Sequence, residues 1–174
     1  MAVLEIRQYP DPVLRQQAKT VEKIDGDLQR LIDDMFETMY AAPGLGLAAP
    51  QVGHSLRLFV YDLSVAEDGK KGSPMVLINP EFVSQTGEAN EDEGCLSIPE
   101  YRESVVRAAR AVVRGMDRDG KEITVEGEGL LAKLLQHEMD HLDGKLFIER
   151  LSSLKRNIFL RRLKKLMKAK KEEG

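Results

Sequence analysis

The sequence has 174 residues, of which 42% are hydrophobic and 32% are charged; these fractions are typical of globular proteins and exclude a disordered chain. We expect one domain, over residues 1–174, that is large enough to bury a core. No stretch approaches the roughly 18 apolar residues of a membrane span. The N-terminus has neither a signal-peptide core nor a transit sequence, which predicts a cytoplasmic protein without a membrane partner.

Charge is distributed unevenly along the chain. Residues 151–174 contain nine Lys or Arg and two Glu, a net charge of +7, so the total of −3 leaves −10 for the first 150 residues. Ser152 and Ser153 are good N-cap residues, and they predict that this basic segment is a C-terminal helix. A basic tail on an acidic body indicates a local contact with an anionic partner and not general nucleic-acid binding.

The first predicted element after the N-terminal turn at Tyr9-Pro-Asp-Pro12 is a helix over roughly residues 27–41. Apolar residues recur there at helical spacing, from Leu28 to Met39. Asp25 or Asp27 can cap the start of this helix, and Pro43-Gly44 would end it. The apolar side of the helix, its methionines included, is typical of a face that packs on the core.

Strands are predicted in the middle of the chain. The β-rich segments are 56–63, a short segment 75–80 that Pro80 would stop, a further strand from about 82, and a hairpin of 105–116 and 122–126 around a turn at 117–120. Residues 88–93 hold four acidic residues, which predicts a solvated loop. Helices would follow over 130–142 and after Ser152. This order predicts an α+β fold with an antiparallel sheet.

The strongest chemical signal is a His-Glu-x-x-His motif in the segment from Gln136 to His141. Residues four apart share one face of a helix, so His137 and His141 can hold one metal ion, while Glu138 is close enough to move a proton. The alternative is a helix whose histidines are ordinary surface or core residues. A catalytic site of this type needs a third protein ligand, which the motif does not contain.

We expect the third ligand upstream. No histidine follows His141, and Phe147 occupies the final ligand position of the metzincin pattern. Among the downstream carboxylates, Glu149 is too close behind the helix to fold back, and Glu172 and Glu173 lie in the tail. The upstream candidates are His54, in an exposed-looking turn, and Cys95, the only cysteine. A lone cysteine is usually a small buried hydrophobe. Cys95 instead follows a glycine in a polar, acidic segment, so we favour it as the ligand.

Three segments together resemble the signature motifs of the peptide deformylase family: Gly44-Leu-Gly-Leu-Ala-Ala-Pro-Gln51, Glu93-Gly-Cys-Leu-Ser97 and the segment Gln136 to His141. By itself the glycine-rich segment indicates only close approach of a ligand backbone, or a plain turn. The similarity extends to Tyr9-Pro-Asp-Pro12 and Gly144-Lys-Leu-Phe147, and so covers nearly the whole chain. It implies the deformylase α+β fold, with antiparallel sheets around a central metal-binding helix and a C-terminal helix.

The resemblance also implies an activity, which is removal of the formyl group from N-terminal N-formylmethionine of new polypeptides, with release of formate. Cys95, His137 and His141 would hold one divalent metal, generally iron(II) in this family, although zinc, nickel or cobalt would suit the same ligands. Water on the metal would attack the formyl carbon, with Glu138 as general base and then acid. The oxyanion donors would be the Gln51 amide and the Leu96 backbone N–H.

The substrate peptide would pair in extended form with the backbone near Leu45, Gly46 and Gly94. Its methionine pocket would be formed by the helix turn before His137, with Arg102 and the first glycine motif. Two residues depart from the commonest family pattern. Pro50 replaces a frequent threonine, and Lys133 replaces an apolar residue, so Lys133 either faces the methionine pocket and alters its preference or extends outward without effect.

The basic C-terminal helix has three interpretations: a helix docked on the body, a weak membrane-surface helix, or a contact with the ribosome, which similar helices make in relatives. We expect the last of these, and a monomeric enzyme. Two other functions compete with deformylation. A metal-dependent endopeptidase would not need Cys95, and a binding protein with a structural metal would need neither Glu138 nor Gln51.

Overall fold

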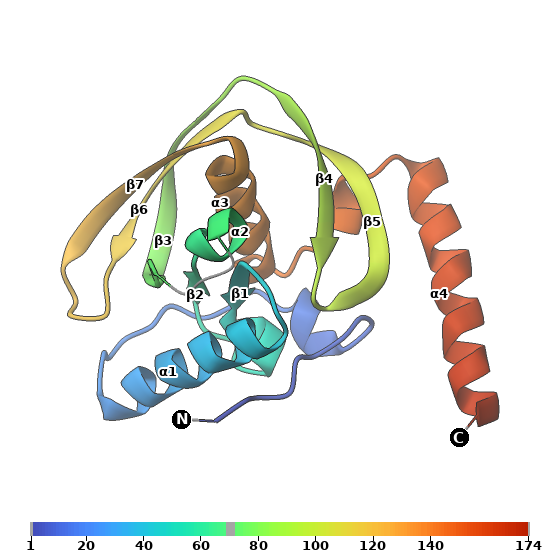
Figure 1. The fold of residues 1–174 in the computed structure, drawn as a ribbon, viewed down its shortest axis with the longest axis horizontal. Coiled ribbons are helices and arrows are strands. Elements are labelled where there is room, and N and C mark those ends of the chain that lie inside the picture. Colours follow the sequence, from blue (N-terminus) through green and yellow to red (C-terminus); the bar gives the residue numbers. More distant parts are fainter. Residues whose placement is uncertain (1, 69–71, 174) are drawn as a thin grey trace.

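The computed structural model describes residues 2–68 and 72–173. Figure 1 shows helix α3 (Gly129–Leu142) in the middle of the molecule, with a large sheet on one side of it and a smaller sheet on the other. The large sheet has five strands in the order β1-β2-β3-β6-β7, and the small one consists of β4 and β5; all pairings are antiparallel. The predicted α+β class with antiparallel sheets is confirmed.

The remaining elements follow the chain order. The strands are β1 (Gly46–Ala48), β2 (Leu58–Tyr61), β3 (Met75–Thr86), β4 (Ala89–Cys95), β5 (Ile98–Arg107), β6 (Arg110–Met116) and β7 (Glu122–Glu128). The α-helices besides α3 are α1 (Gly26–Ala41), α2 (Ser64–Asp68) and α4 (Ser153–Glu173), and three short 3-10 helices are η1 (Pro12–Arg15), η2 (Ala49–Val52) and η3 (Phe147–Arg150).

Helix α1 agrees with its prediction. Asp25 caps it, because its side chain accepts a hydrogen bond from the Leu28 backbone N–H at 3.0 Å. The apolar face of α1, which includes Ile32 and Met35, packs in one core cluster with residues of β1 and β2. This packing fixes the start of the glycine-rich segment that follows α1.

The prediction that Pro80 ends a strand was wrong. Strand β3 continues from Met75 to Thr86, and its pairing with β6 shifts register between Ile78 and Glu81. A proline inside a strand is tolerated at such an irregularity, where no ladder hydrogen bond needs its missing N–H. Asn79, with a φ of 52°, hydrogen-bonds through its side chain to both the N–H and the C=O of Val21. These bonds hold the irregular backbone in place.

The prediction of a solvated loop at residues 88–93 was also wrong, because these residues form most of β4. β4 pairs only with β5, so one of its edges is unpaired, and charged side chains are common on such edges. Glu91 and Asp92 are exposed, whereas Glu93 is buried against α3. The acidic run therefore combines an exposed strand edge with one inward-facing carboxylate.

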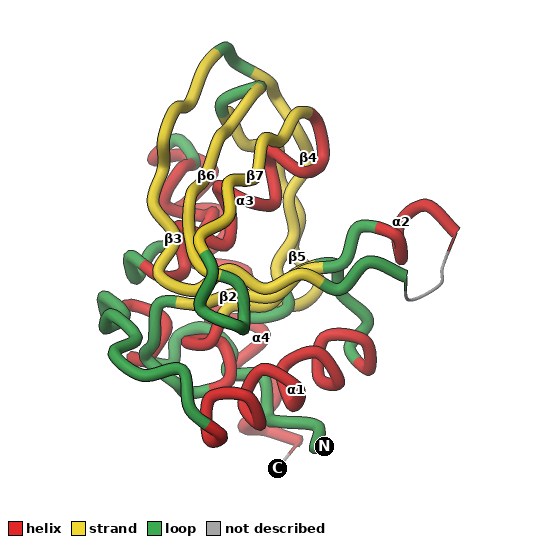
Figure 2. Tube along the Cα trace, turned by 90° about the vertical axis from the view of Figure 1, so that its left-hand side faces the viewer, coloured by secondary structure: helices red, strands yellow, loops and turns green. Residues whose placement is uncertain are grey.

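The predicted strand 105–116 is divided between two sheets. β5 ends at Arg107 and β6 begins at Arg110, in different sheets. At the break, the Gln136 side chain accepts from the Ala108 N–H and donates to the Ala108 C=O, both at 2.9 Å. The predicted hairpin after the break is confirmed as β6 and β7, which lie side by side with β3 next to α3 (Figure 2).

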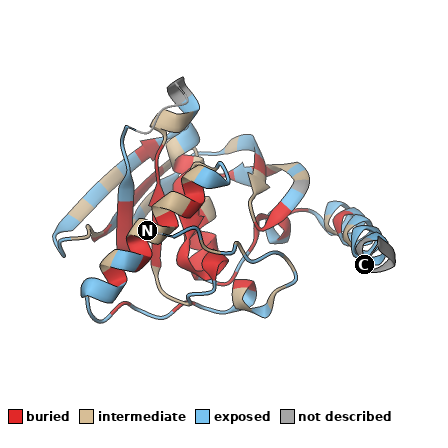
Figure 3. Ribbon diagram, turned by 60° about the horizontal axis from the view of Figure 1, so that its bottom comes forward, coloured by how far each residue is buried: buried red, intermediate tan, exposed pale blue. Residues whose placement is uncertain are grey.

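Helix α3 is buried on nearly all sides, as Figure 3 shows by its red colour. It ends as predicted at Asp143-Gly144. Gly144 has a φ of 74°, and a Cβ at this position would lie 2.6 Å from the Arg15 carbonyl oxygen. A side chain there would push away the segment after η1, so the glycine is required both by the turn and by the packing.

Helix α4 is attached to the body by its first half. Phe159 is 2% exposed and packs on Tyr9 and Tyr101 in a third core cluster. Beyond Leu163 the described side chains are mainly exposed, including Leu166 and Met167, each at 46% (Figure 3). None of the helices in the described ranges combines the length and the apolar character that crossing a membrane requires.

Candidate metal centre and active site

Three potential metal ligands from two elements meet beside α3. His137 and His141 lie on consecutive turns of that helix, and Cys95 is the last residue of β4. The Cys95 Sγ lies 3.3 Å from His141 Nε2, which lies 3.2 Å from His137 Nε2, and all three ligand atoms fall within 4.8 Å of one another. His54 is not part of this group; it lies in the turn after η2.

The spacing of these atoms fits a bound divalent ion. Two imidazole nitrogens at about 2.0–2.1 Å from a tetrahedral ion are about 3.3 Å apart, close to the separation of the two Nε2 atoms. Two imidazoles and a thiolate suit zinc, iron, nickel or cobalt. Three protein ligands leave one position for water or substrate, which is the arrangement of a catalytic site.

A buried carboxylate orients the first histidine. Glu93 Oε1 accepts a hydrogen bond from His137 Nδ1 at 2.8 Å, which turns Nε2 toward Cys95 and His141. Burial alone would raise the pKa of Glu93, but hydrogen bonds from Arg107 and His137 outweigh burial and lower this pKa to about 2. Glu93 therefore stays ionised and remains an acceptor for the imidazole N–H.

A series of ion pairs balances the charge of Glu93 and ends near the surface. Arg107, whose side chain is 3% exposed, donates to both oxygens of Glu93 at 2.7 Å and to Asp140 at 2.6 Å. Asp140 also accepts two hydrogen bonds from Arg150 on η3. Buried charges are tolerated when they are paired and hydrogen-bonded in this way. The chain of four alternating charges thus joins β4, β5, α3 and η3 behind His137.

Glu138 points into the same space as the ligands. Its side chain is 3% exposed, and among the described residues its Oε2 has no hydrogen-bond partner. Burial raises the pKa of Glu138 to about 7. A Cβ on Gly46 would lie 3.2 Å from Glu138 Oε1, so any other residue here would require the carboxylate to shift slightly. An unpaired buried acceptor beside a metal group is suited to taking a proton from a reacting molecule.

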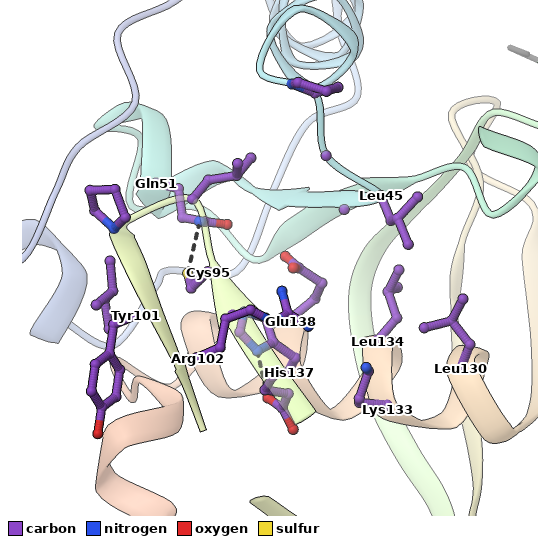
Figure 4. A pocket seen from close by; sticks show the side chains of 18 residues that line it. Leu45, Gln51, Cys95, Tyr101, Arg102, Leu130, Lys133, Leu134, His137 and Glu138 are labelled. Atoms are coloured by element: carbon purple, nitrogen blue, oxygen red, sulfur yellow. Dashed lines mark hydrogen bonds and ion pairs between the residues drawn. The ribbon is translucent and has the colours of Figure 1, made fainter. Parts of the chain in front are cut away.

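The side-chain amide of Gln51 lies on the opposite wall. Gln51 Oε1 accepts from the Ala48 N–H at 2.9 Å, which directs Nε2 toward Ser97 Oγ at 3.2 Å and Cys95 Sγ at 3.5 Å. Figure 4 shows this amide beside Cys95. Leu96 follows the cysteine at the β4–β5 turn, with its side chain against Gly44. Both residues border the space in front of the ligand atoms.

A cavity of about 610 Å³ opens onto these groups. Its lining includes all four residues that the sequence analysis assigned to substrate binding, namely Leu45, Gly46, Gly94 and Arg102. Figure 4 shows Leu45, Leu130, Lys133 and Leu134 on one side of Glu138, and Tyr101 on the other. The apolar side chains of Leu45, Leu130 and Leu134 thus line the part of the cavity beside the candidate reaction centre.

Five polar residues of the site were not singled out by sequence reasoning: Glu93, Ser97, Arg107, Asp140 and Arg150. Glu93 and Asp140 lie inside the recognised motifs, so their positions were a usable signal. Arg107 carried no local signal, because it is one of 26 Lys and Arg residues and lies 30 residues before His137. Only the folded chain shows that its guanidinium lies between Glu93 and Asp140.

Comparison with known proteins assigns this architecture to a family. The model of the family described as polypeptide deformylase matches residues 3–157. A peptide deformylase from Syntrophobacter fumaroxidans is 57% identical over 168 residues, which cover 97% of this chain and 98% of that protein. These matches include every segment that forms the candidate metal centre.

Solved structures agree with the sequence matches. A peptide deformylase from Legionella pneumophila is 50% identical, covers 97% of this chain and 98% of its own, and superposes with a TM-score of 0.90. One from Synechococcus elongatus, in complex with actinonin, is 42% identical, covers 91% and 85%, and has a TM-score of 0.84. With its sheets, its central helix and its sequence all matching, this chain belongs to the polypeptide deformylase family.

Proposed function

We propose that Cys95, His137 and His141 hold the metal of this deformylase, with Glu138 as the proton carrier and Gln51 and Leu96 as oxyanion donors. The chain is a metal-dependent hydrolase that removes the formyl group from N-formylmethionine of nascent polypeptides and releases formate. We further propose that residues 1–174 form one catalytic domain that acts in the cytoplasm, where nascent chains emerge. The single observation that carries the site assignment is the convergence of three ligand atoms within 4.8 Å beside a buried, unpaired carboxylate oxygen.

A bound divalent ion supplies Lewis acidity, which lowers the pKa of water and polarises a carbonyl oxygen. The protein residues supply the proton transfers. Glu138 is desolvated and faces the ligands, so its carboxylate can accept a proton from the attacking water. The same carboxyl group can then deliver this proton to the nitrogen of methionine as its bond to the formyl carbon breaks. The products are formate and a free N-terminal amine.

The oxygen of the formyl group gains negative charge during the attack, and it needs hydrogen-bond donors. The bond from the Ala48 N–H to Gln51 Oε1 fixes the orientation of the amide, so that its NH₂ group is directed toward Cys95. Leu96 follows Cys95 in the chain, and its backbone N–H is the second proposed donor. Preorganised donors cost no reorientation at the moment of reaction, which supports these two groups as the oxyanion site.

Replacing Gln51 with alanine should lower kcat by about 100-fold to 1,000-fold, the usual cost of losing one oxyanion donor. The measurement is formate release from formyl-Met-Ala-Ser by metal-loaded enzyme, with bound metal determined in the same sample. Gln51→Glu is the matched variant, because it keeps the acceptor for Ala48 but removes the NH₂ group. A Gln51→Glu enzyme with wild-type kcat would contradict the assignment.

Substrate would bind as an added strand between β1 and β4. Among the described residues β1 pairs only with β2 and β4 only with β5, and residues of both strands line the cavity. The backbone of Leu45 and Gly46 on one side and Gly94 on the other can pair with an extended peptide. Arg102 lies across Gly94, where a Cβ would come within 2.7 Å of its guanidinium. The place of Arg102 in the cavity lining supports its predicted role as part of the methionine pocket.

We propose iron(II) as the metal in the cell, with zinc, nickel or cobalt as functional substitutes. The mixed sulfur and nitrogen ligands accept all of these ions. Metal analysis of protein purified without oxygen tests this assignment, and iron should be the major metal present. A chelator should abolish formate release from formyl-Met-Ala-Ser, and added iron(II) should restore it; activity that survives complete metal removal would refute metal-dependent deformylation by this site.

We propose that α4 contacts the ribosome. It lies within residues 151–174, which carry a net charge of +7, and its described residues from Lys164 to Ala169 are exposed. Deleting residues after Leu151 would expose Tyr101 and Phe147, so the test keeps the helix and changes Lys164, Lys165 and Lys168 to glutamate. Co-sedimentation with ribosomes should weaken and its salt dependence should decrease, while hydrolysis of a short formyl peptide continues. Unchanged co-sedimentation would contradict the proposal.

A further inference from the structure

One part of the active-site cavity is less apolar than a methionine pocket needs to be. Leu45, Leu130 and Leu134 provide an apolar wall beside the candidate reaction centre, and Lys133 stands among them (Figure 4). Lys133 lies three residues after Leu130 and four before His137, so all three side chains share one face of α3. Lysine therefore occupies the wall that the side chain of formylmethionine would contact.

The Lys133 side chain reaches from α3 to the opposite sheet. Its Nζ donates to the backbone carbonyl oxygen of Asp92 on β4 at 2.9 Å, three residues before Cys95. The side chain thus links α3 to β4. Its methylene groups can pack against apolar atoms, while its ammonium lies at the strand edge. Lys133 therefore lines the cavity and does not simply extend outward.

The ammonium retains hydrogen-bonding capacity. An ammonium group has three N–H donors, and the Asp92 carbonyl is the only acceptor that Lys133 has among the described residues. No carboxylate of the described residues lies within ion-pair distance of it. The acidic residues that line the cavity, Glu93 and Glu138, are both buried, and Glu93 is already paired with Arg107. Donors therefore remain for an oxygen atom of a ligand in this compartment.

We propose that Lys133 is a specificity-determining residue that extends the substrate class to peptides beginning with formylmethionine sulfoxide. The inference rests on the proposed function, because it needs the formyl group at the metal centre and the first side chain against Leu130 and Leu134. Oxidation turns the thioether of methionine into a polar sulfoxide, and a wall made only of hydrocarbon leaves its oxygen without a donor. The Lys133 ammonium can donate to that oxygen while its stem contacts the rest of the side chain.

The experiment compares kcat/KM for formyl-Met-Ala-Ser and its methionine sulfoxide analogue, each sulfoxide epimer separately, by formate release. The enzymes are metal-loaded wild type, Lys133→Met and Lys133→Arg. Lys133→Met keeps an unbranched side chain, one heavy atom shorter, and removes the charge. The matched control is Lys121→Met, because Lys121 is exposed in the β6–β7 turn and does not line the cavity. Thermal unfolding of each variant verifies that it is folded.

We expect the preference for methionine over its sulfoxide to rise about tenfold in Lys133→Met, the effect of one hydrogen bond from a charged donor. Lys133→Arg should remain near wild type, and Lys121→Met should equal it. An unchanged preference in folded Lys133→Met would overturn this inference and leave the proposed function intact. A third substrate, formyl-Met-Asp-Ser, tests the second position. An effect of Lys133→Met on this peptide alone would also overturn the inference, since Lys133 would then face the second residue. No formate from formyl-Met-Ala-Ser by wild type would overturn the proposed function as well.

Discussion

Replacing Glu138 with glutamine should lower kcat for formyl-Met-Ala-Ser by about 100-fold to 10,000-fold. This is the contribution expected of a positioned general base and acid. Glutamine keeps the shape of the side chain against Gly46 but accepts no proton from water. Formate release measures the rate, and metal analysis of the same sample should give wild-type content, because Glu138 is not among the three ligands. A loss of rate with full metal content separates proton transfer from metal binding.

The control for Glu138→Gln is Glu149→Gln. Glu149 lies on η3, is exposed, and forms no contact with the cavity. The Glu149→Gln substitution makes the same chemical change at a place where no proton transfer is proposed. The kcat of this variant should therefore be that of wild type. If Glu138→Gln retained more than a tenth of the wild-type rate, another group would have to move the proton and the assignment of Glu138 would be wrong.

Replacing Cys95 with alanine should remove the metal. The loss of a residue that only orients a ligand typically costs 10-fold to 100-fold in metal affinity, and the loss of a ligand should cost more than about 100-fold. We expect protein purified with metal in the buffer to contain far less than one ion per chain, and formate release to fall in proportion. Metal analysis after dialysis is the measurement.

The matched control for Cys95→Ala is His54→Ala, which removes the third histidine of the chain. His54 lies outside the group of three ligand atoms, so this variant should keep its metal and its rate. Full retention of metal by Cys95→Ala would refute the ligand assignment. Retention by Cys95→Ala together with loss by His54→Ala would mean that the ligand set itself is different.

Some elements could be predicted because their signals are local. The spacing from Leu28 to Met39 and the cap at Asp25 depend only on helix geometry, and α1 formed where they indicated. The hairpin of β6 and β7 follows from a turn sequence between two short β-rich segments. His137, Glu138 and His141 share a helix, so their relative positions followed from residue spacing alone.

The predictions from sequence were wrong where pairing with a neighbouring element determines the local structure. Residues 88–93 are polar enough for a loop, but they form a strand because β5 pairs with them and Arg107 neutralises Glu93. Pro80 would end an isolated strand, yet β3 continues because β6 pairs on both sides of a shift in register. Both outcomes depend on residues distant in sequence, and no local pattern contains that information.

The sequence by itself determined the inventory of the site, because one cysteine and three histidines leave few ways to complete a metal centre around a His-Glu-x-x-His helix. The tertiary structure alone decided three further matters: that the Cys95 sulfur comes within 3.3 Å of His141, that Arg107 supports Glu93 behind His137, and that the Lys133 ammonium bonds to β4. Each is a contact between side chains on separate elements. Such contacts depend on how α3 packs between the two sheets, and this packing results from the whole core and not from any single segment.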